Sequence, residues 1–126
     1  MAVQGERMLK SYDVAAATGS TYVIGYISAN NTVARASGTG AFFAGIIENA
    51  PTNSSDKASV VVAGLSKVRA GTAAILRGTP LTSDANGHAI TLAATATSHV
   101  LGYAEEAPTG YGQLFAIRVN PQHARG

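Results

Sequence analysis

Short apolar runs alternate with polar turns along most of this chain. The runs are rich in β-branched and aromatic residues and have the length of strands, not of helices. Residues 41–47 form the most apolar run, which predicts a strand buried on both faces, whereas residues 64–69 read as a half-buried edge strand. The predicted strands cover residues 22–27, 33–36, 41–47, 59–63, 64–69, 99–104 and 113–119, with a hairpin over 78–92 and a short apolar element at 72–77.

The turn residues point to the same class of fold. Asn86-Gly87 supplies the positive φ angles of a tight hairpin turn, and His88, Ile90 and Leu92 alternate with smaller residues after it. Turn formers recur every 8 to 14 residues, and no convincing helix of ten residues is present. We therefore predict an all-β fold, a compact barrel or sandwich of about eight short strands with long loops and little helix.

The ends of the chain are less regular. Residues 1–20 form a predicted N-terminal arm, in which a short helix over 8–17 closed by Gly19 and an extended segment are equally compatible with the pattern. Residues 21–120 form the predicted β domain, residues 93–98 a loop or a single helical turn, and residues 121–126 a tail. At 126 residues the chain has room for one core.

One stretch occurs twice. The segment 45–52, Gly-Ile-Ile-Glu-Asn-Ala-Pro-Thr, returns as 102–109, Gly-Tyr-Ala-Glu-Glu-Ala-Pro-Thr, with five of eight residues unchanged. An apolar run follows each copy, at 58–63 and at 113–119. The repeat predicts one supersecondary unit used twice, a strand, a turn closed by Pro and a returning partner strand. Its role is predicted to be architectural.

Composition suggests that the core is thin. Of the 126 residues, 24 are alanine, and large aromatic residues are limited to three Phe and five Tyr. A small domain with such a core is often completed by neighbouring subunits, which favours oligomerisation over a stable monomer. The absence of cysteine excludes disulfides, thiolate metal sites and a cysteine nucleophile.

The charge and the length of the apolar runs argue against two classes of partner. Nine Lys and Arg against seven Asp and Glu give a net charge of +2, without the basic stripe or stacking platform that nucleic acid binding requires. The longest apolar run, 41–47, is far shorter than the roughly 20 residues that cross a bilayer. The segment 1–8 has no signal-peptide core. The chain is expected to bind neither nucleic acid nor membrane and to be made in a cytoplasm.

Catalytic and metal-binding patterns are weak. His88, His99 and His123 have no metal-ligand spacing, so surface hydrogen bonding is the better interpretation. Gly38-Thr39-Gly40 precedes a strand and so offers no helix N-terminus to a phosphate, and a Gly-x-Ser-x-Gly nucleophile turn is absent. We expect no cofactor and no enzymatic activity.

Two arrangements of carboxylates leave alternatives open. Glu48 and Glu105 hold matching places in the repeat and could form a glycosidase pair, although a Glu at a turn more simply bonds backbone amides. Asp56, Asp84 and Asn86 could offer oxygens to calcium. The Asp84 segment lacks the later bidentate Glu of a calcium loop, and turn geometry explains these residues better.

The segment from Gly40 to Asn120, about two thirds of the chain, resembles the small capsid decoration, or cement, proteins of tailed phages. The part of the chain before Gly40 is longer and more strand-like than the opening of that family. The resemblance lies in a strand with a small-residue step, a second strand, an Ala-Gly-Thr stretch, a Gly-x-Pro-Leu hairpin and a Gly-x-Ala turn before a closing strand. These features correspond to residues 44–47, 59–63, 70–74, 78–87, 101–110 and 115–119.

The resemblance implies a homotrimer on the outer surface of a mature phage head, clamping capsomers of the major capsid protein. It implies a structural virion protein. Our own prediction is a capsid contact through the N-terminal arm, residues 1–20, and a trimer contact through the aromatic strand segments near the end of the chain. We predict capsid contact through Val3, Gln4, Arg7, Met8 and Tyr12, and trimer contact through Tyr111 and Phe115. The alternative is a carbohydrate- or receptor-binding β module of a virion, which would need exposed aromatic residues on one face.

Overall fold

The computed structural model describes residues 7–37, 42–53, 55–92 and 99–122, and these residues contain nine strands and no helix. The prediction of an all-β barrel fold is confirmed. The strands are β1 Arg7–Val14, β2 Val23–Ala29, β3 Thr32–Arg35, β4 Phe43–Ile47, β5 Lys57–Arg69, β6 Pro80–Ser83, β7 Ala89–Thr91, β8 Val100–Ala104 and β9 Leu114–Gln122.

The first half of the chain closes into a five-stranded barrel. Its strands follow the order β1-β3-β2-β4-β5, and β5 pairs back with β1. The β1–β3 pair is parallel, and the other pairs are antiparallel. Closure removes the free sheet edges that would otherwise invite pairing with other chains.

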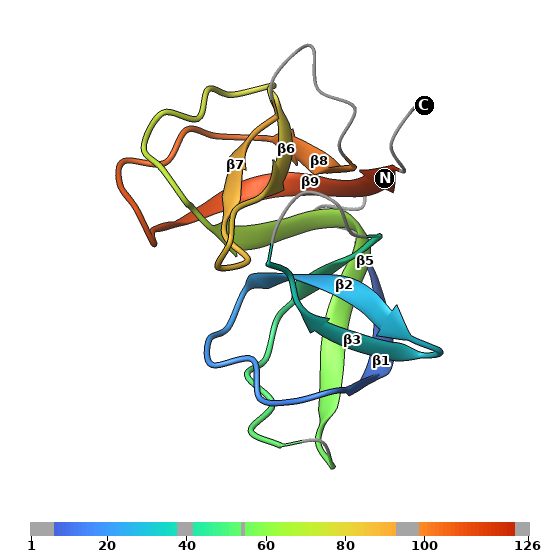
Figure 1. Ribbon diagram of the computed structural model, residues 1–126. Helices are drawn as coiled ribbons and strands as arrows, with labels where there is room; N and C mark the ends of the chain where they lie inside the picture. Colours follow the sequence, from blue (N-terminus) through green and yellow to red (C-terminus); the bar gives the residue numbers. More distant parts are fainter. Residues whose placement is uncertain (1–6, 38–41, 54, 93–98, 123–126) are drawn as a thin grey trace.

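The second half forms a second ring around the other end of β5. Its strands follow the order β5-β9-β8-β6-β7, and a parallel bridge between Ala70 and Ala89 joins the end of β5 to β7. Figure 1 shows the result as two lobes connected by β5, with β1–β4 in one and β6–β9 in the other. We call β1–β4 with residues 57–63 the first lobe, and residues 64–71 with β6–β9 the second lobe.

The two lobes repeat one pattern of strand pairing. Each paired residue of β1–β3 and β2–β3 has a counterpart in the second lobe, and the number of residues between a residue and its counterpart is constant. For β4–β5 this number is larger by one. The repeat seen over residues 45–52 and 102–109 is therefore part of a unit that spans a whole lobe. Matching pairs are Gly25–Arg35 with Leu81–Thr91, Val14–Val33 with Ala70–Ala89, and Ile46–Val61 with Tyr103–Arg118.

Strand β5 belongs to both lobes, and one sequence prediction about it needs correction. Residues 59–63 and 64–69 form one continuous strand. Residues 64–69 pair with β9 along one side, and residues 57–64 pair with β1. The segment 64–69 is half-buried and has a strand partner along one side, as predicted. Gly64, with φ of 97°, lies where the strand passes from one lobe to the other and adopts a conformation that side chains disfavour.

Packing explains why β4 is buried on both faces, as predicted. Successive strand residues point to opposite sides, and a register shift between β2 and β4, where Gly25 faces Gly45 and Tyr26 faces Phe43, resets this alternation within β4. Ala44 and Ile47 belong to the core of the first lobe, whereas Phe43 and Ile46 belong to a larger cluster that includes Leu101, Phe115 and other residues of the second lobe. β4 therefore lies between two apolar cores.

The strand assignments decide two further expectations. Of the two conformations left open for residues 8–17, the extended one is present and the helix is not, because residues 7–14 form β1 and pair with β5 and β3 inside the first barrel. The apolar element expected at 72–77 is not a strand. Ile75 packs into the core there, while the neighbouring Leu76 is exposed. The expectation for residues 93–98 concerns a segment outside the described residues.

Candidate functional site

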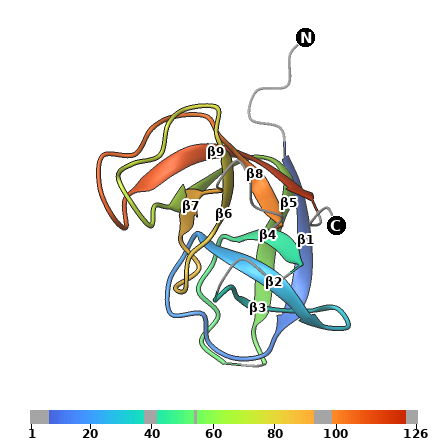
Figure 2. The same cartoon turned by 45° about the horizontal axis from the view of Figure 1, so that its top comes forward.

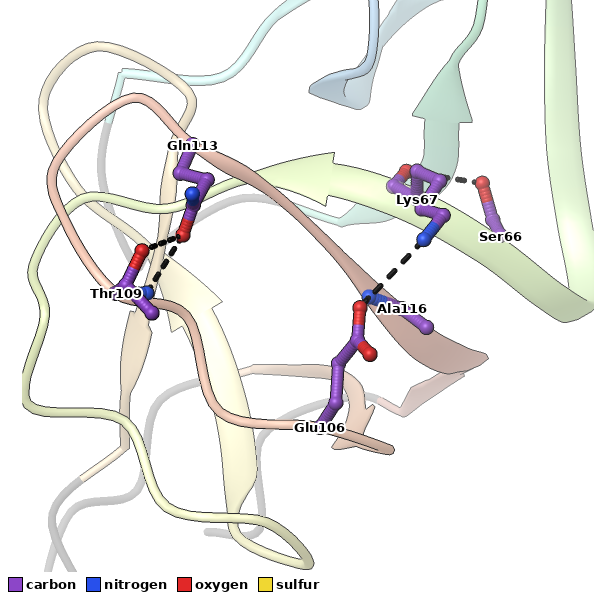
Figure 3. A network of polar contacts seen from close by, with 6 residues as sticks. All are labelled: Ser66, Lys67, Glu106, Thr109, Gln113 and Ala116. Atoms are coloured by element: carbon purple, nitrogen blue, oxygen red, sulfur yellow. Dashed lines mark hydrogen bonds and ion pairs between the residues drawn. The ribbon is translucent and has the colours of Figure 1, made fainter.

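The repeated turn has the same hydrogen bonds in both lobes. In the first, Asp56 Oδ2 accepts bonds from the backbone N–H and the hydroxyl of Thr52, each at 2.9 Å. In the second, Gln113 Oε1 accepts the equivalent pair of bonds from Thr109 (Figure 3), including a backbone N–H at 2.6 Å. Asp56 and Gln113 hold equivalent places in the two copies. The motif closes a turn and holds the next strand in place, which explains its recurrence.

A second side chain in each turn reaches the returning strand. Asn49 Oδ1 accepts the backbone N–H of Ser59 at 2.9 Å, and Glu106 Oε1 accepts that of Ala116 at 2.8 Å. Lys67 Nζ lies 3.5 Å from the same Glu106 oxygen (Figure 3). The bond from Ala116 and the charge of Lys67 hold the pKa of Glu106 below its ordinary value. This carboxylate thus replaces an amide of the first lobe.

We predict a difference in acid sensitivity between Asp56→Gln and the natural chain. The bonds from Thr52 lower the pKa of Asp56 below its ordinary value of 3.8. Their stabilisation is present above that value and is lost as the pH falls through the lowered pKa. Because Gln113 makes the same bonds without a charge, Asp56→Gln should lose less stability between pH 5 and pH 2 in urea unfolding. These pH limits are about one to two pH units around the ordinary pKa.

The control for that experiment is Asp56→Ala, which removes both bonds from Thr52. It should be less stable than the natural chain at neutral pH and should show a smaller loss in acid. Equal acid slopes for the natural chain and Asp56→Gln would contradict the assignment of the acid response to this carboxylate.

Two arginines fix the lobes to each other. Arg35 of β3 donates to the carbonyl of Asn86 at 2.6 Å and to that of Thr18 at 2.7 Å. Arg69 of β5 donates to the carbonyl of Thr21 at 2.8 Å and to its hydroxyl at 3.0 Å. Bonds to a charged donor are stronger than neutral ones. Each arginine leaves its own lobe to satisfy carbonyls of the other or of the connecting segments.

His88 lies in this junction. Its side chain is buried, its Nε2 lies 3.3 Å from the Arg35 guanidinium, and its ring packs against Tyr111 with centroids 5.2 Å apart. Burial lowers the pKa of His88 below 6.5, and Arg35 and Arg69 lower it further against the opposing effect of Asp84. The prediction that the histidines form hydrogen bonds at the surface is therefore wrong for His88. His123 lies outside the described residues.

The oxygens considered for calcium are used by turns. Asp84 Oδ1 accepts the backbone N–H groups of Asn86 and His88, and Asp56 Oδ2 accepts the two bonds from Thr52. Within the residues that the structure describes, no group of three or more His, Cys, Asp and Glu side chains could hold a metal ion. The geometry favours the turn interpretation of these residues.

Glu48 and Glu105 each pair with an arginine. Glu48 accepts a bond from Arg7, and Arg118 Nε lies 3.1 Å from Glu105 Oε2. Their backbone N–H groups make equivalent bonds to the carbonyls of Ser59 and Ala116, both 2.9 Å. The two carboxylates therefore occupy the same position in separate lobes. The expectation that the chain is not an enzyme stays a prediction.

The predicted capsid contacts divide into three groups. Arg7 and Met8 are exposed on β1, and Met8 has 63% of its surface accessible. Tyr12 is only 8% exposed and packs in the core of the first lobe, so its side chain is not available for a capsid contact. Val3 and Gln4 lie outside the described residues.

The predicted trimer contacts also separate. Tyr111 is 62% exposed in the loop between β8 and β9. Phe115 is 1% exposed and belongs to the large core cluster. A side chain enclosed in the core cannot contact another subunit, so the assignment of Phe115 is corrected. The alternation of β9 places Phe115 inward together with Ile117 and Val119.

A surface hollow lies where β1 crosses the passage of β5 between the lobes. Its volume is about 310 Å³, and its lining includes Arg7, Met8, Ala63 and Gly64. A second hollow of about 250 Å³ shares Arg7 and follows β5 over Leu65, Ser66 and Lys67. The sequence signal for this place is a glycine inside an apolar strand, which often marks a bend. The predicted strand boundary between residues 63 and 64 falls at the same glycine.

No protein-family model matches the sequence, and no curated protein matches it. No helix among the described residues is long and apolar enough to cross a membrane.

The pairing pattern defines the class: an all-β protein in which a five-stranded barrel and a second ring share one long strand. Among solved structures, the fold is similar to that of the N base of the head fiber gp8.5 in bacteriophage phi29, with a TM-score of 0.66. The match covers 96% of this chain and 100% of that chain at 16% sequence identity. At this identity the likeness establishes a shared fold.

Proposed function

We propose that this protein is a virion structural protein of a tailed phage, a decoration protein that binds as a homotrimer to the outer surface of the mature head. The observation that carries the proposal is the fold similarity to a phage head fiber base over 96% of this chain. The sequence resemblance to capsid decoration proteins over residues 40–120 supports it independently. Synthesis takes place in the host cytoplasm, and the protein then remains on the virion.

The proposed mechanism is adhesion. A trimer that contacts several copies of the major capsid protein raises the free energy needed to separate them under the pressure of packaged DNA. A lasting contact of this kind buries about 1,200–2,000 Å² in total. The lattice that offers the contact exists only after the head expands, so binding selects the mature head. The fixed junction between the lobes suits this role, because a rigid subunit loses little conformational entropy on binding.

The test is reconstitution on heads. Purified full-length protein is mixed with expanded heads of its own phage that lack it, and with unexpanded heads as the matched control. We expect saturable binding in multiples of three on expanded heads only, and slower DNA loss on heating. Absence of binding to expanded heads would overturn the proposal, and binding to glycans instead would support the receptor-binding alternative.

A further inference from the structure

Two exposed apolar side chains project from the second lobe. Leu76 is 69% exposed in the loop between β5 and β6, and Tyr111 is 62% exposed in the loop between β8 and β9. Both loops lie at the same end of the lobe in two views (Figures 1 and 2). We interpret these two exposed apolar groups as parts of one contact surface. We call Leu76 and Tyr111 the projection.

The loop that carries Tyr111 is held in place. Gly112 donates its backbone N–H to the carbonyl of Ala70 at 2.6 Å, and Arg69 lies 3.4 Å from the Gly112 carbonyl. The Tyr111 ring rests against His88. An aromatic side chain that is already ordered pays little entropy when it enters a partner, so the loop presents Tyr111 in a form ready for binding.

The repeated architecture shows that the fold does not need these side chains. At the spacing that relates β3 to β7, the position in the first lobe equivalent to Leu76 is Ser20. At the spacing that relates the two repeated turns, the position equivalent to Tyr111 is Ser54, which lies outside the described residues. One copy of the unit thus carries two large apolar residues where the other carries serines. A requirement of the fold would apply to both copies.

The hollow at the passage of β5 has the chemistry to receive an aromatic ring. Arg7 can stack on a ring face, Met8 offers a thioether, and Gly64 adds no side chain to the lining. The second lobe does not repeat this set of residues, because the positions equivalent to Met8 and Ala63 are Gly64 and Asn120. We call Arg7, Met8, Ala63 and Gly64 the hollow.

From these features we infer that the projection of one subunit enters the hollow of the next, with the Tyr111 ring between Arg7 and Met8 of a second copy of this chain. An interface that joins two different patches is heterologous, and it generates a ring when the rotation between subunits closes. The inference rests on the proposed function, since it specifies how the proposed trimer is built. It assigns Arg7 and Met8 to self-association and not to the capsid.

The test compares two single variants by sedimentation equilibrium of the full chain. Tyr111→Ala removes the projecting ring, and Ala63→Trp fills the hollow. Each should weaken trimer formation by at least about 30-fold, as expected for a central aromatic contact. Tyr103→Ala, which alters another partly exposed tyrosine, is the matched control and should form trimers normally. Thermal unfolding checks that each variant is folded, and Met8→Ala replaces Ala63→Trp if the latter is not.

Mixing the two variants identifies the geometry. Tyr111→Ala keeps its hollow, and Ala63→Trp keeps its projection. One molecule of each variant can therefore make a single contact, so the mixture should form heterodimers that do not close into trimers. Trimers of either folded variant would overturn the inference and leave the proposed function standing. A natural chain that is monomeric at all concentrations would overturn both this contact and the proposed trimer, whereas binding to heads tests the decoration role separately.

Discussion

Replacing Gly45 with alanine is expected to lower the free energy of unfolding by about 3 kcal/mol or more. A Cβ at this position would lie 1.9 Å from the carbonyl oxygen of Val61, and Gly45 has φ of 146°. The atom that must give way belongs to the backbone of β5, which both lobes share. Since small domains have a total stability of about 5–15 kcal/mol, this single methyl group threatens the fold.

A substitution at Gly102 separates the effect of the steric clash on stability from the effect of the positive φ angle. Gly102 is the counterpart of Gly45 in the repeat, and a Cβ there would lie 2.0 Å from the carbonyl oxygen of Arg118, without a left-handed φ. Gly102→Ala should therefore be destabilising through the clash alone, and less so than Gly45→Ala. The measurement is denaturant unfolding at equilibrium, with midpoint and slope compared among the variants.

Gly110→Ala is the control for both substitutions. Nothing lies within 4 Å of a Cβ at that position. Its stability should match that of the natural chain within about 0.5 kcal/mol. If Gly45→Ala and Gly102→Ala were as stable as Gly110→Ala, the close approach of the paired strands would not be what the repeat preserves.

These glycines show what the sequence can reveal about the fold. The stretch 45–52 and its copy are visible because turns and close strand approaches require particular residues, namely Gly, Pro and Thr. The rest of the repeat is not visible. Strand positions demand only an apolar side chain of suitable size, so residues 23–35 and 79–91 pair alike although they match only at the Ala-Asn of the turn, 29–30 and 85–86. The pairing register is a property of backbone hydrogen bonding, so it is only weakly visible in the residue types.

Strand β1 escapes sequence prediction for a related reason. Its first residues are exposed, and only Tyr12 and Val14 are buried, so its pattern lacks the alternation of a half-buried strand. The strand is held by its long pairing with β5, which lies far away in sequence. Such non-local pairing leaves no local signal. The same distance conceals the hollow, because Arg7 and Gly64 meet only once the barrel has closed.

Two of the residues predicted to contact partners are buried in the cores. The sequence prediction assigns Tyr12 and Phe115, two aromatic residues, to contacts with partners. They are instead interior aromatic residues of the two cores. Tyr12 lies opposite Ala58 across the β1–β5 pair, and Phe115 lies opposite Val68 across β5–β9. At this equivalent pair each lobe has one aromatic and one smaller residue. The two lobes differ in which strand of the pair carries the aromatic residue.

This arrangement leads to a second large expected effect. Phe115→Ala should lower the free energy of unfolding by about 3–5 kcal/mol, because it removes a fully buried ring and leaves a cavity. Leu114→Ala, at the adjacent and 38% exposed position, is the control and should change stability far less. In Phe115→Ala, the fraction of trimer should decrease only as far as the fraction of folded protein decreases. In Tyr111→Ala, trimers should be lost although the protein stays folded.

The first lobe supplies the compensating change. Because Tyr12 occupies the position equivalent to Val68, adding Val68→Phe to Phe115→Ala would give the second lobe the small and large residues in the order of the first. The double variant should recover part of the stability lost in Phe115→Ala, since cores tolerate exchanges that conserve volume. Val68→Phe alone should be destabilising, because two rings would then share the space of one. If the double variant were as unstable as the sum of its single substitutions, the two pairs would not be interchangeable, and the likeness of the lobes would end at the backbone.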